Sequence, residues 1–158
     1  MNVGRLVRIN VSQGGVPKHP IPSARIGRGG VEGDRQRDLR YHGGPERAVS
    51  LWSLEVLEAL GAEGHPIAAG AAGENLTVAG LDWAAVAPGA RLAIGPVRLQ
   101  VTGYADPCEK VAGCFAGGRF QRISQKLRPG WSRVYARVLS EGRVAEGDPV
   151  ALEAAAGA

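Results

Sequence analysis

The sequence predicts a mainly β protein with a few helices, folded as a closed or nearly closed β-barrel. Many short segments alternate apolar and polar residues with a period of two, as strands with one buried face do. The 158 residues include 24 glycines and 10 prolines but only 5% aromatic residues, which favours short elements joined by turns. No run of alternating strand and helix patterns indicates a doubly wound parallel sheet.

Strand patterns recur along the whole chain. The clearest is 89–103, where two apolar runs flank a Gly95–Pro96 turn. Segment 132–152 alternates again, with turns expected at 141–142 and 147–149. Further strands are expected at 3–11, 47–52 and 73–80, and the glycine- and arginine-rich segment 23–44 is expected to form short strands and a functional loop.

Two segments have helical patterns, 53–60 and 120–127. The first carries an apolar stripe, with Ser53 able to cap its first turn and Gly61 able to end it. No repeat or linker interrupts the chain. Residues 1–153 are therefore expected to form a single domain, followed by a frayed tail at 154–158.

The chain is basic, with a formal charge of +4 and a pI of about 9.5. Six arginines lie within residues 25–47, and the planar guanidinium suits contacts to phosphate, so an anionic partner and a solvated basic surface both remain open. No run approaches the roughly 18 apolar residues of a membrane span, and the N-terminus lacks a signal-peptide pattern. We expect a cytoplasmic protein without a membrane partner.

Both cysteines lie in "GYADPCEKVAGC", residues 103–114. Two thiols make a poor disulfide framework, and their C-x5-C spacing is wider than structural zinc sites use. Cys108 follows Pro107 in a charged loop, where Lys110 and nearby arginines can stabilise a thiolate, which is both a nucleophile and a soft metal ligand. Cys114, among small and apolar residues, is interpreted as a buried side chain.

Two further motifs could bind a ligand. In "YHGGPERAV", 41–49, the glycines after His42 let the backbone approach a ligand, and Arg47 could clamp an oxyanion, although a plain turn fits the spacing better. In "GENL", 73–76, Glu74 and Asn75 could bind the edge of a heterocycle, but Asn more often satisfies turn backbone groups.

A basic and aromatic segment, "RPGWSRVYARVL" at 128–139, could bind single-stranded nucleic acid. An outer barrel face with arginine side chains lying along it fits the pattern better, so nucleic acid is not an expected partner. The chain has no G-x-S-x-G elbow, no phosphate-binding loop and no dinucleotide fingerprint.

Taken in order, these segments resemble a MOSC domain, named for the C-terminal domain of molybdenum-cofactor sulfurases. The resemblance covers about residues 3–152 and is closest to the short, stand-alone bacterial branch, with no room for the pyridoxal-phosphate domain that precedes this module in full sulfurases. The segments that carry it are "GVEGDRQRDLRYHGGPERAVSLWS", "GENLTVAGLDWAAVAPGARLAIG", "VRLQVTGYADPCEKV" and "GWSRVYARVLSEGRVAEGDPVAL". The charges directly after the thiol in "DPCEKV" depart from related chains.

The resemblance implies a pyruvate-kinase-barrel-like fold that binds the molybdenum cofactor (molybdopterin), an anionic pterin dithiolene. It further implies relatives that reduce N-hydroxylated compounds with electrons from a flavin or iron–sulfur protein. Cys108 would ligate molybdenum or carry sulfur, and Asp106 would orient a proton donor. The residues expected to contact the cofactor are Arg35, His42, Arg47, Glu74, Asn75, Lys110 and Arg133.

Two functions follow from this resemblance. The first is a molybdenum-dependent oxidoreductase in which Cys108 is the metal ligand. The alternative is a non-catalytic carrier of the cofactor or of sulfur, with a persulfide on Cys108.

Overall fold

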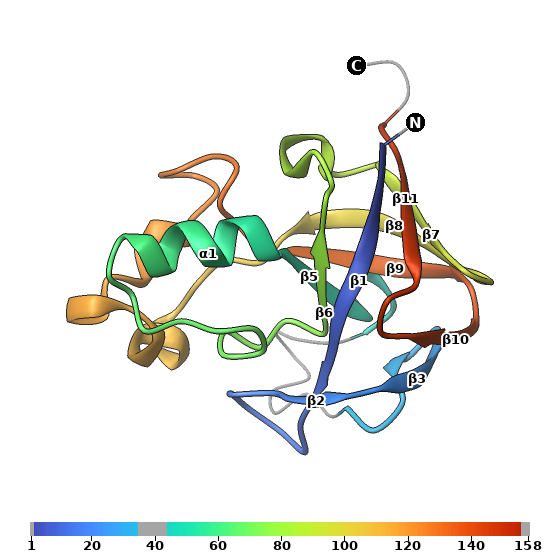
Figure 1. Ribbon diagram of the computed structural model, residues 1–158, viewed down its shortest axis with the longest axis horizontal. Helices are drawn as coiled ribbons and strands as arrows, with labels where there is room; N and C mark the ends of the chain where they lie inside the picture. Colours follow the sequence, from blue (N-terminus) through green and yellow to red (C-terminus); the bar gives the residue numbers. More distant parts are fainter. Residues whose placement is uncertain (1, 35–43, 156–158) are drawn as a thin grey trace.

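The computed structural model of the chain describes residues 2–34 and 44–155, so the predicted site residues Arg35 and His42 lie outside it. Strands dominate these ranges (Figure 1). The strands are β1 (Asn2–Val11), β2 (His19–Ile21), β3 (Ser23–Gly27), β4 (Gly30–Val31), β5 (Val49–Ser53), β6 (Leu76–Ala79), β7 (Arg91–Ile94), β8 (Val97–Tyr104), β9 (Val134–Ser140), β10 (Gly142–Ala145) and β11 (Pro149–Glu153). The helices are α1 (Leu54–Ala62) and the short 3-10 helices η1 (Pro45–Arg47), η2 (Trp83–Ala85), η3 (Glu109–Cys114), η4 (Ala116–Gly118) and η5 (Phe120–Ile123).

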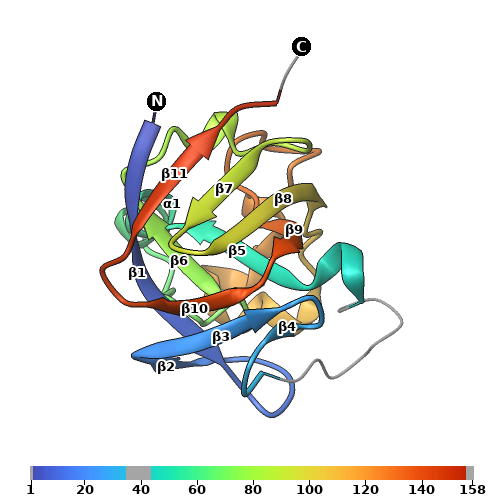
Figure 2. The ribbon, with the colours of Figure 1, turned by 90° about the vertical axis from the view of Figure 1, so that its right-hand side faces the viewer.

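Seven strands close into a barrel, which confirms the predicted fold. They follow one another in the order β11–β7–β8–β9–β5–β6–β1, and β1 closes the ring by pairing with β11 (Figure 2). Strand β2 extends this sheet from β1, and β10, β3 and β4 form a separate small sheet. The pairing of β5 with β6 is parallel, whereas the other pairings are antiparallel. A β5–α1–β6 crossover unit, which the strand patterns did not predict, produces this one parallel contact.

The closing seam depends on a glycine. Gly4 of β1 is opposite Val150 of β11, and a Cβ at this position would lie 2.0 Å from the carbonyl oxygen of Ala79 in β6. Real Cβ atoms do not approach an oxygen this closely, so only glycine lets β1 reach both of its neighbours.

Two hydrophobic cores share strand β5, whose five residues are all buried. Val49 and Leu51 pack into the barrel interior with apolar residues from the other strands. Trp52 faces the opposite side and packs beneath α1 with Leu57 and Leu60. The second core also includes Val111, Phe115 and Ile123, so α1 and the 3-10 helices cover the outer side of β5.

Helix α1 begins as predicted and ends later than predicted. The Ser53 hydroxyl accepts a hydrogen bond from Val56 N–H at 3.2 Å, which confirms the expected N-cap. The prediction that Gly61 ends the helix is wrong. Gly64, with φ of +96°, is the left-handed residue, and His65 N–H donates back to the Leu60 carbonyl in a Schellman motif.

The helix expected at 120–127 is replaced by the single 3-10 turn η5 and a following turn. Phe120, Ile123 and Leu127 have the spacing of an amphipathic helix, but Leu127 is 67% exposed and provides no buried stripe. The strand expected at 73–80 is also shorter, since β6 starts at Leu76. None of the helices in the described ranges has the length and apolar character needed to cross a membrane.

Candidate functional site

The loop that carries Cys108 leaves the end of β8 and is fixed to the start of β9. Ala105 N–H donates to the carbonyl of Arg133 at 3.0 Å, continuing the contact between these strands. Asp106 then turns outward and is exposed. Cys108 is a free, half-buried thiol with extended backbone, directly ahead of η3. The thiol therefore lies at an accessible edge of the barrel on a loop that a rigid ladder positions.

Arg133 lies directly beside this loop, and two tryptophans fix the backbone just before it. The indole N–H of Trp52 donates to the Trp131 carbonyl at 3.0 Å, and that of Trp83 donates to the Ser132 carbonyl at 3.0 Å. The Arg133 side chain is 9% exposed, and its Nη1 donates to the Ala72 carbonyl at 2.7 Å. Its Nε is buried without a hydrogen-bond partner among the described residues, so the guanidinium has unused capacity.

Arg133 is the electrostatic centre of the site. Burial lowers its pKa, because a charged guanidinium is costly to desolvate. Four neighbours raise the pKa of Arg133 instead, because their negative forms favour the cation: Tyr135, Glu74, Cys108 and Cys114. Two predicted site residues, Cys108 and Glu74, are thus brought to the same cation from separate parts of the chain.

Tyr135 connects Arg133 to Arg47, and sequence reasoning did not assign it to the site. Burial raises the pKa of its phenol, Arg133 and Arg47 lower it, and Cys108 and Asp106 raise it. The Arg47 guanidinium lies 5.4 Å from the centroid of the Tyr135 ring. The only sequence signal for Tyr135 is its position two residues after Arg133, on the same face of an alternating strand.

Glu74 lies beneath this cluster and is completely buried. Its Oε2 accepts hydrogen bonds from Gly70 N–H at 3.0 Å and from the Thr77 hydroxyl at 3.4 Å. Its Oε1 has no partner among the described residues. Burial is the main cause that raises the pKa of Glu74 from 4.5 to about 6, against the opposing effects of these bonds and of Arg133.

Asn75 is also completely buried, and its side-chain amide forms hydrogen bonds with other protein groups. Its Oδ1 accepts from Ser50 N–H at 3.0 Å, and its Nδ2 donates to the Asn10 carbonyl at 3.3 Å and to Asp34 Oδ2 at 2.9 Å. Lys18 Nζ pairs with the same Asp34 oxygen at 2.6 Å. Sequence reasoning did not identify Lys18 or Asp34, because both contacts are long-range.

The remaining predicted residues occupy different environments. Lys110 is exposed and has no ion-pair partner within residues 2–34 and 44–155. Cys114 is only half buried, and its thiol donates to the Ala71 carbonyl at 3.2 Å. Burial raises the pKa of the Cys114 thiol, and the charge of Glu74 raises it further. Direct cofactor contacts of Glu74, Asn75 and Lys110 stay predictions.

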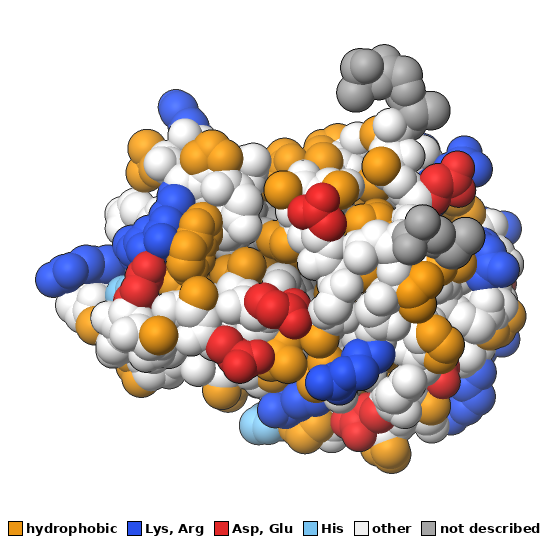
Figure 3. All heavy atoms as spheres, turned by 45° about the horizontal axis from the view of Figure 1, so that its top comes forward, with side chains coloured by type: hydrophobic (Ala, Val, Ile, Leu, Met, Phe, Trp, Pro, Cys, Tyr) orange, Lys and Arg blue, Asp and Glu red, His pale blue; other side chains and the backbone are white. Residues whose placement is uncertain are grey.

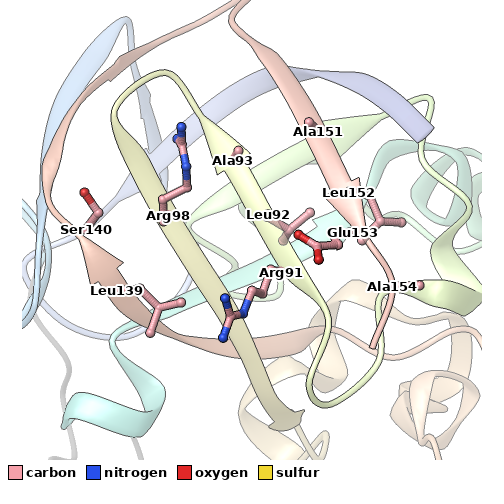
Figure 4. A pocket seen from close by; sticks show the side chains of 10 residues that line it. All are labelled: Arg91, Leu92, Ala93, Arg98, Leu139, Ser140, Ala151, Leu152, Glu153 and Ala154. Atoms are coloured by element: carbon pink, nitrogen blue, oxygen red, sulfur yellow. The ribbon is translucent and has the colours of Figure 1, made fainter. Parts of the chain in front are cut away.

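A separate cavity lies elsewhere on the barrel. It has a volume of about 810 Å³ and is formed by strands β7, β8, β9 and β11 (Figure 4). Arg91, Arg98 and Glu153 contribute its charged side chains, and none of the predicted site residues lines it.

The basic and aromatic segment 128–139, which the sequence did not favour as a nucleic-acid site, does not form an open basic strip. Arg133 is buried, Tyr135 is half buried, and Arg137 pairs with Glu46 at 2.7 Å. Within the described ranges, moreover, no three His, Cys, Asp or Glu residues are grouped as metal ligands.

Comparison with known proteins identifies relatives. The family model described as "MOSC domain" matches residues 38–151. The uncharacterized protein YflK of Bacillus subtilis is 38% identical over 138 residues, covering 84% of this chain and 60% of that protein. Protein YiiM of Escherichia coli is 30% identical over 132 residues, covering 78% of this chain and 56% of that protein. The chain thus matches less than two thirds of the length of both relatives.

The solved structures agree with this relationship. The crystal structure of YiiM from Geobacillus stearothermophilus superimposes with a TM-score of 0.73 and 26% identity, covering 95% of this chain and 75% of that one. The YUAD protein of Bacillus subtilis, at 18% identity, has the same fold with a TM-score of 0.74 and covers 96% of both chains.

Proposed function

The chain belongs to the MOSC domain family, which is associated with the molybdenum cofactor, and from this premise we propose that it binds that cofactor and reduces N-hydroxylated compounds. The observation that supports the proposal best is the position of Cys108. Its free, half-buried thiol lies within the electrostatic reach of the buried Arg133. In this proposal Cys108 is the protein ligand of molybdenum.

The residues of the site fit an anionic pterin dithiolene. Molybdenum bound by a dithiolene accepts a soft thiolate, and Cys108 is a free, half-buried thiol. The buried Nε of Arg133 has no partner in the described part of the chain, and the exposed Arg47 lies beside Tyr135. These cations suit the phosphate and the negative charge of the cofactor. Lys110, two residues after the thiol, is exposed and suits the same role.

The reaction requires two electrons and two protons. The N–O bond of the substrate breaks, an N–H bond forms, and oxygen leaves as water, so that R–NHOH becomes R–NH2. The cofactor supplies the two-electron redox chemistry when bound. Exposed Asp106 lies two residues before the thiol, and we assign it the role of holding the water or acid that delivers protons. A flavin or iron–sulfur protein would supply the electrons.

A direct experiment tests this function. The protein is produced in a host that makes the cofactor, and reduction of a hydroxylaminopurine is followed with reduced methyl viologen as the donor. Cys108→Ala is expected to abolish turnover, whereas the matched variant Cys114→Ala retains it. Metal-loaded wild-type protein without any turnover would contradict the oxidoreductase proposal.

One observation favours a second candidate function. A half-exposed thiol beside a buried guanidinium can also hold a persulfide anion, so a sulfur or cofactor carrier would use the same Cys108. Mass spectrometry of freshly purified protein distinguishes the two functions. An added sulfur atom on Cys108 supports the carrier, and unmodified Cys108 together with bound molybdenum supports the oxidoreductase.

A further inference from the structure

Positive charge is concentrated in the segment that follows Cys108. Residues 110–133 contain six lysines and arginines and no aspartate or glutamate. Four of these cations lie close together in sequence, in and after η4 and η5. We define the basic patch as Arg119, Arg122, Lys126, Leu127, Arg128 and Trp131. In Figure 3, lysine and arginine side chains gather at the left-hand end of the molecule.

Part of the basic patch is held rigid by its own contacts. The Arg128 guanidinium stacks on the ring of Trp131 with its carbon 3.3 Å from the ring centroid, and that of Arg122 lies 5.3 Å from the same centroid. Glu63 pairs with both arginines, at 2.9 Å for Arg128. Because these groups are already ordered, a partner that binds them loses little conformational entropy there.

The rest of the basic patch is exposed and unpaired. Arg119 and Lys126 are exposed and form no ion pair with any described residue. Leu127, between two cations, is 67% exposed, more than any other large apolar side chain in the described ranges. Arginine and tryptophan beside an apolar residue are typical of the centre of a protein interface, with unpaired charges at its rim.

A small cavity adjoins the basic patch. It has a volume of about 200 Å³, and its lining includes Gln125, Pro129 and Gly130 together with Trp83 and Tyr104. Since Gln125 and Pro129 flank the patch residues 126–128, a side chain of a docked protein could enter this cavity while acidic groups meet the cations.

The basic patch and Cys108 belong to one layer of the fold. Helix η3 begins directly after Cys108 and packs against η4 and η5. Val111 of η3, Phe115 and Ile123 of η5 share the core beneath α1. A protein bound to the patch would therefore lie against the same layer from which the thiol loop emerges.

We propose that the basic patch is the docking surface for a small acidic electron-transfer protein. The proposal rests on the proposed reductase function, which needs electrons from another protein. A cluster of four cations, two of which pair with Glu63, keeps a net positive charge and attracts an acidic carrier. Complementary charge mainly raises the association rate and selects the partner. Flavin and iron–sulfur carriers with acidic surfaces fit this requirement.

The test compares two charge-reversal double variants of the holoprotein. Arg119→Glu with Lys126→Glu changes the patch, and Arg5→Glu with Arg91→Glu is a matched control on exposed, unpaired cations of the barrel. Binding to two probes, a plant-type [2Fe–2S] ferredoxin and a flavodoxin, is measured at low and at high salt. The patch variant should bind at least about tenfold more weakly at low salt, with the control within about twofold of wild type.

Several results would overturn this docking surface. The first is that the wild type shows no salt-dependent binding of either probe. The second is that both double variants lose the same affinity for the probes. The third is that the patch binds a single-stranded oligonucleotide but neither probe. Turnover with methyl viologen is measured in parallel because it bypasses docking. Normal methyl viologen turnover in the patch variant supports the proposal. A wild type inactive with methyl viologen contradicts the reductase function, whereas the binding measurements still decide the docking surface.

Discussion

At the scale of single residues, the site is organised by a buried cation, with a carboxyl below it and a thiol beside it. Arg133 and Glu74 interact electrostatically although no hydrogen bond joins them. Each keeps one buried polar atom that has no partner among residues 2–34 and 44–155, Nε of Arg133 and Oε1 of Glu74. Leaving such atoms unsatisfied costs stability, so a ligand or a water molecule that bonds to them would stabilise the fold.

The buried carboxyl of Glu74 makes stability depend on pH. Its pKa is about 6 in the fold against 4.5 ordinarily, so the folded state binds more protons than the unfolded state between these values. Stability contributed by this group is therefore lost as pH rises from 4.5 to above 6. The loss is about 2 kcal/mol.

Glu74→Gln should remove this pH dependence. Urea unfolding of the apoprotein, followed by tryptophan fluorescence at pH 4.5 and 7.5, should show wild type losing about 2 kcal/mol more than the variant. Glu58→Gln, on the exposed side of α1, is the matched control and should retain the wild-type difference. Identical pH dependence in wild type and Glu74→Gln would contradict the assignment.

The two thiols should differ in reactivity. Burial and the charge of Glu74 raise the pKa of Cys114, so less of it is thiolate. With iodoacetamide at pH 8, Cys108 of the apoprotein should be alkylated at least about fivefold faster than Cys114. Peptide mass spectrometry measures both rates, and Cys108→Ser and Cys114→Ser provide single-thiol controls. Equal rates would show that the buried environment of Cys114 does not protect it.

The sequence singled out some residues of this cluster and not others. The charged loop made Cys108 a candidate, because a thiol there is unlike an ordinary buried cysteine, and the structure places it half-buried on that loop. Glu74 and Asn75 were identified by local motif, but their complete burial depends on β1, β5 and the 70–73 turn packing around them. Tyr135 and Asp34 were missed, since their importance arises from contacts with residues far away in sequence.

At the scale of elements, the local sequence pattern predicted strands correctly where one face of the strand is buried. The hairpin of β7 and β8 turns at Gly95 and Pro96 as expected, because its alternating residues face a continuous core. The local pattern gave the wrong element where contacts with distant parts of the chain decide the structure. The parallel contact of β5 with β6 depends on α1 packing over Trp52, and η5 stops because Leu127 finds no core to join.

The barrel seam provides a test of an element-scale contact. Gly4→Ala would place a Cβ against the Ala79 carbonyl, so β1 must move away from β6 or β11. The free energy of unfolding should fall by about 3 kcal/mol or more. Gly29→Ala is the matched control, since a Cβ there meets nothing within 4 Å. Urea denaturation measures both, and a loss at Gly4 no larger than at Gly29 would contradict the close approach.

At the scale of the whole molecule, the closed barrel serves as a rigid support for two loops. One carries Cys108 from the end of β8, and the other carries Arg133 into β9, where the indoles of Trp52 and Trp83 hold its backbone. Catalytic and binding groups on loops need such a support to keep their geometry. Helix α1 and the 3-10 helices add a second layer beside the thiol, and that layer carries the basic patch.

The molybdenum content of purified protein tests most directly whether Cys108 holds the cofactor's metal. Wild type, Cys108→Ser and Cys114→Ser are produced in a host that makes the cofactor, and molybdenum per protein chain is measured after desalting. We expect wild type and Cys114→Ser to carry similar amounts and Cys108→Ser to carry at least about tenfold less. Molybdenum retained at the wild-type level by folded Cys108→Ser would contradict the account.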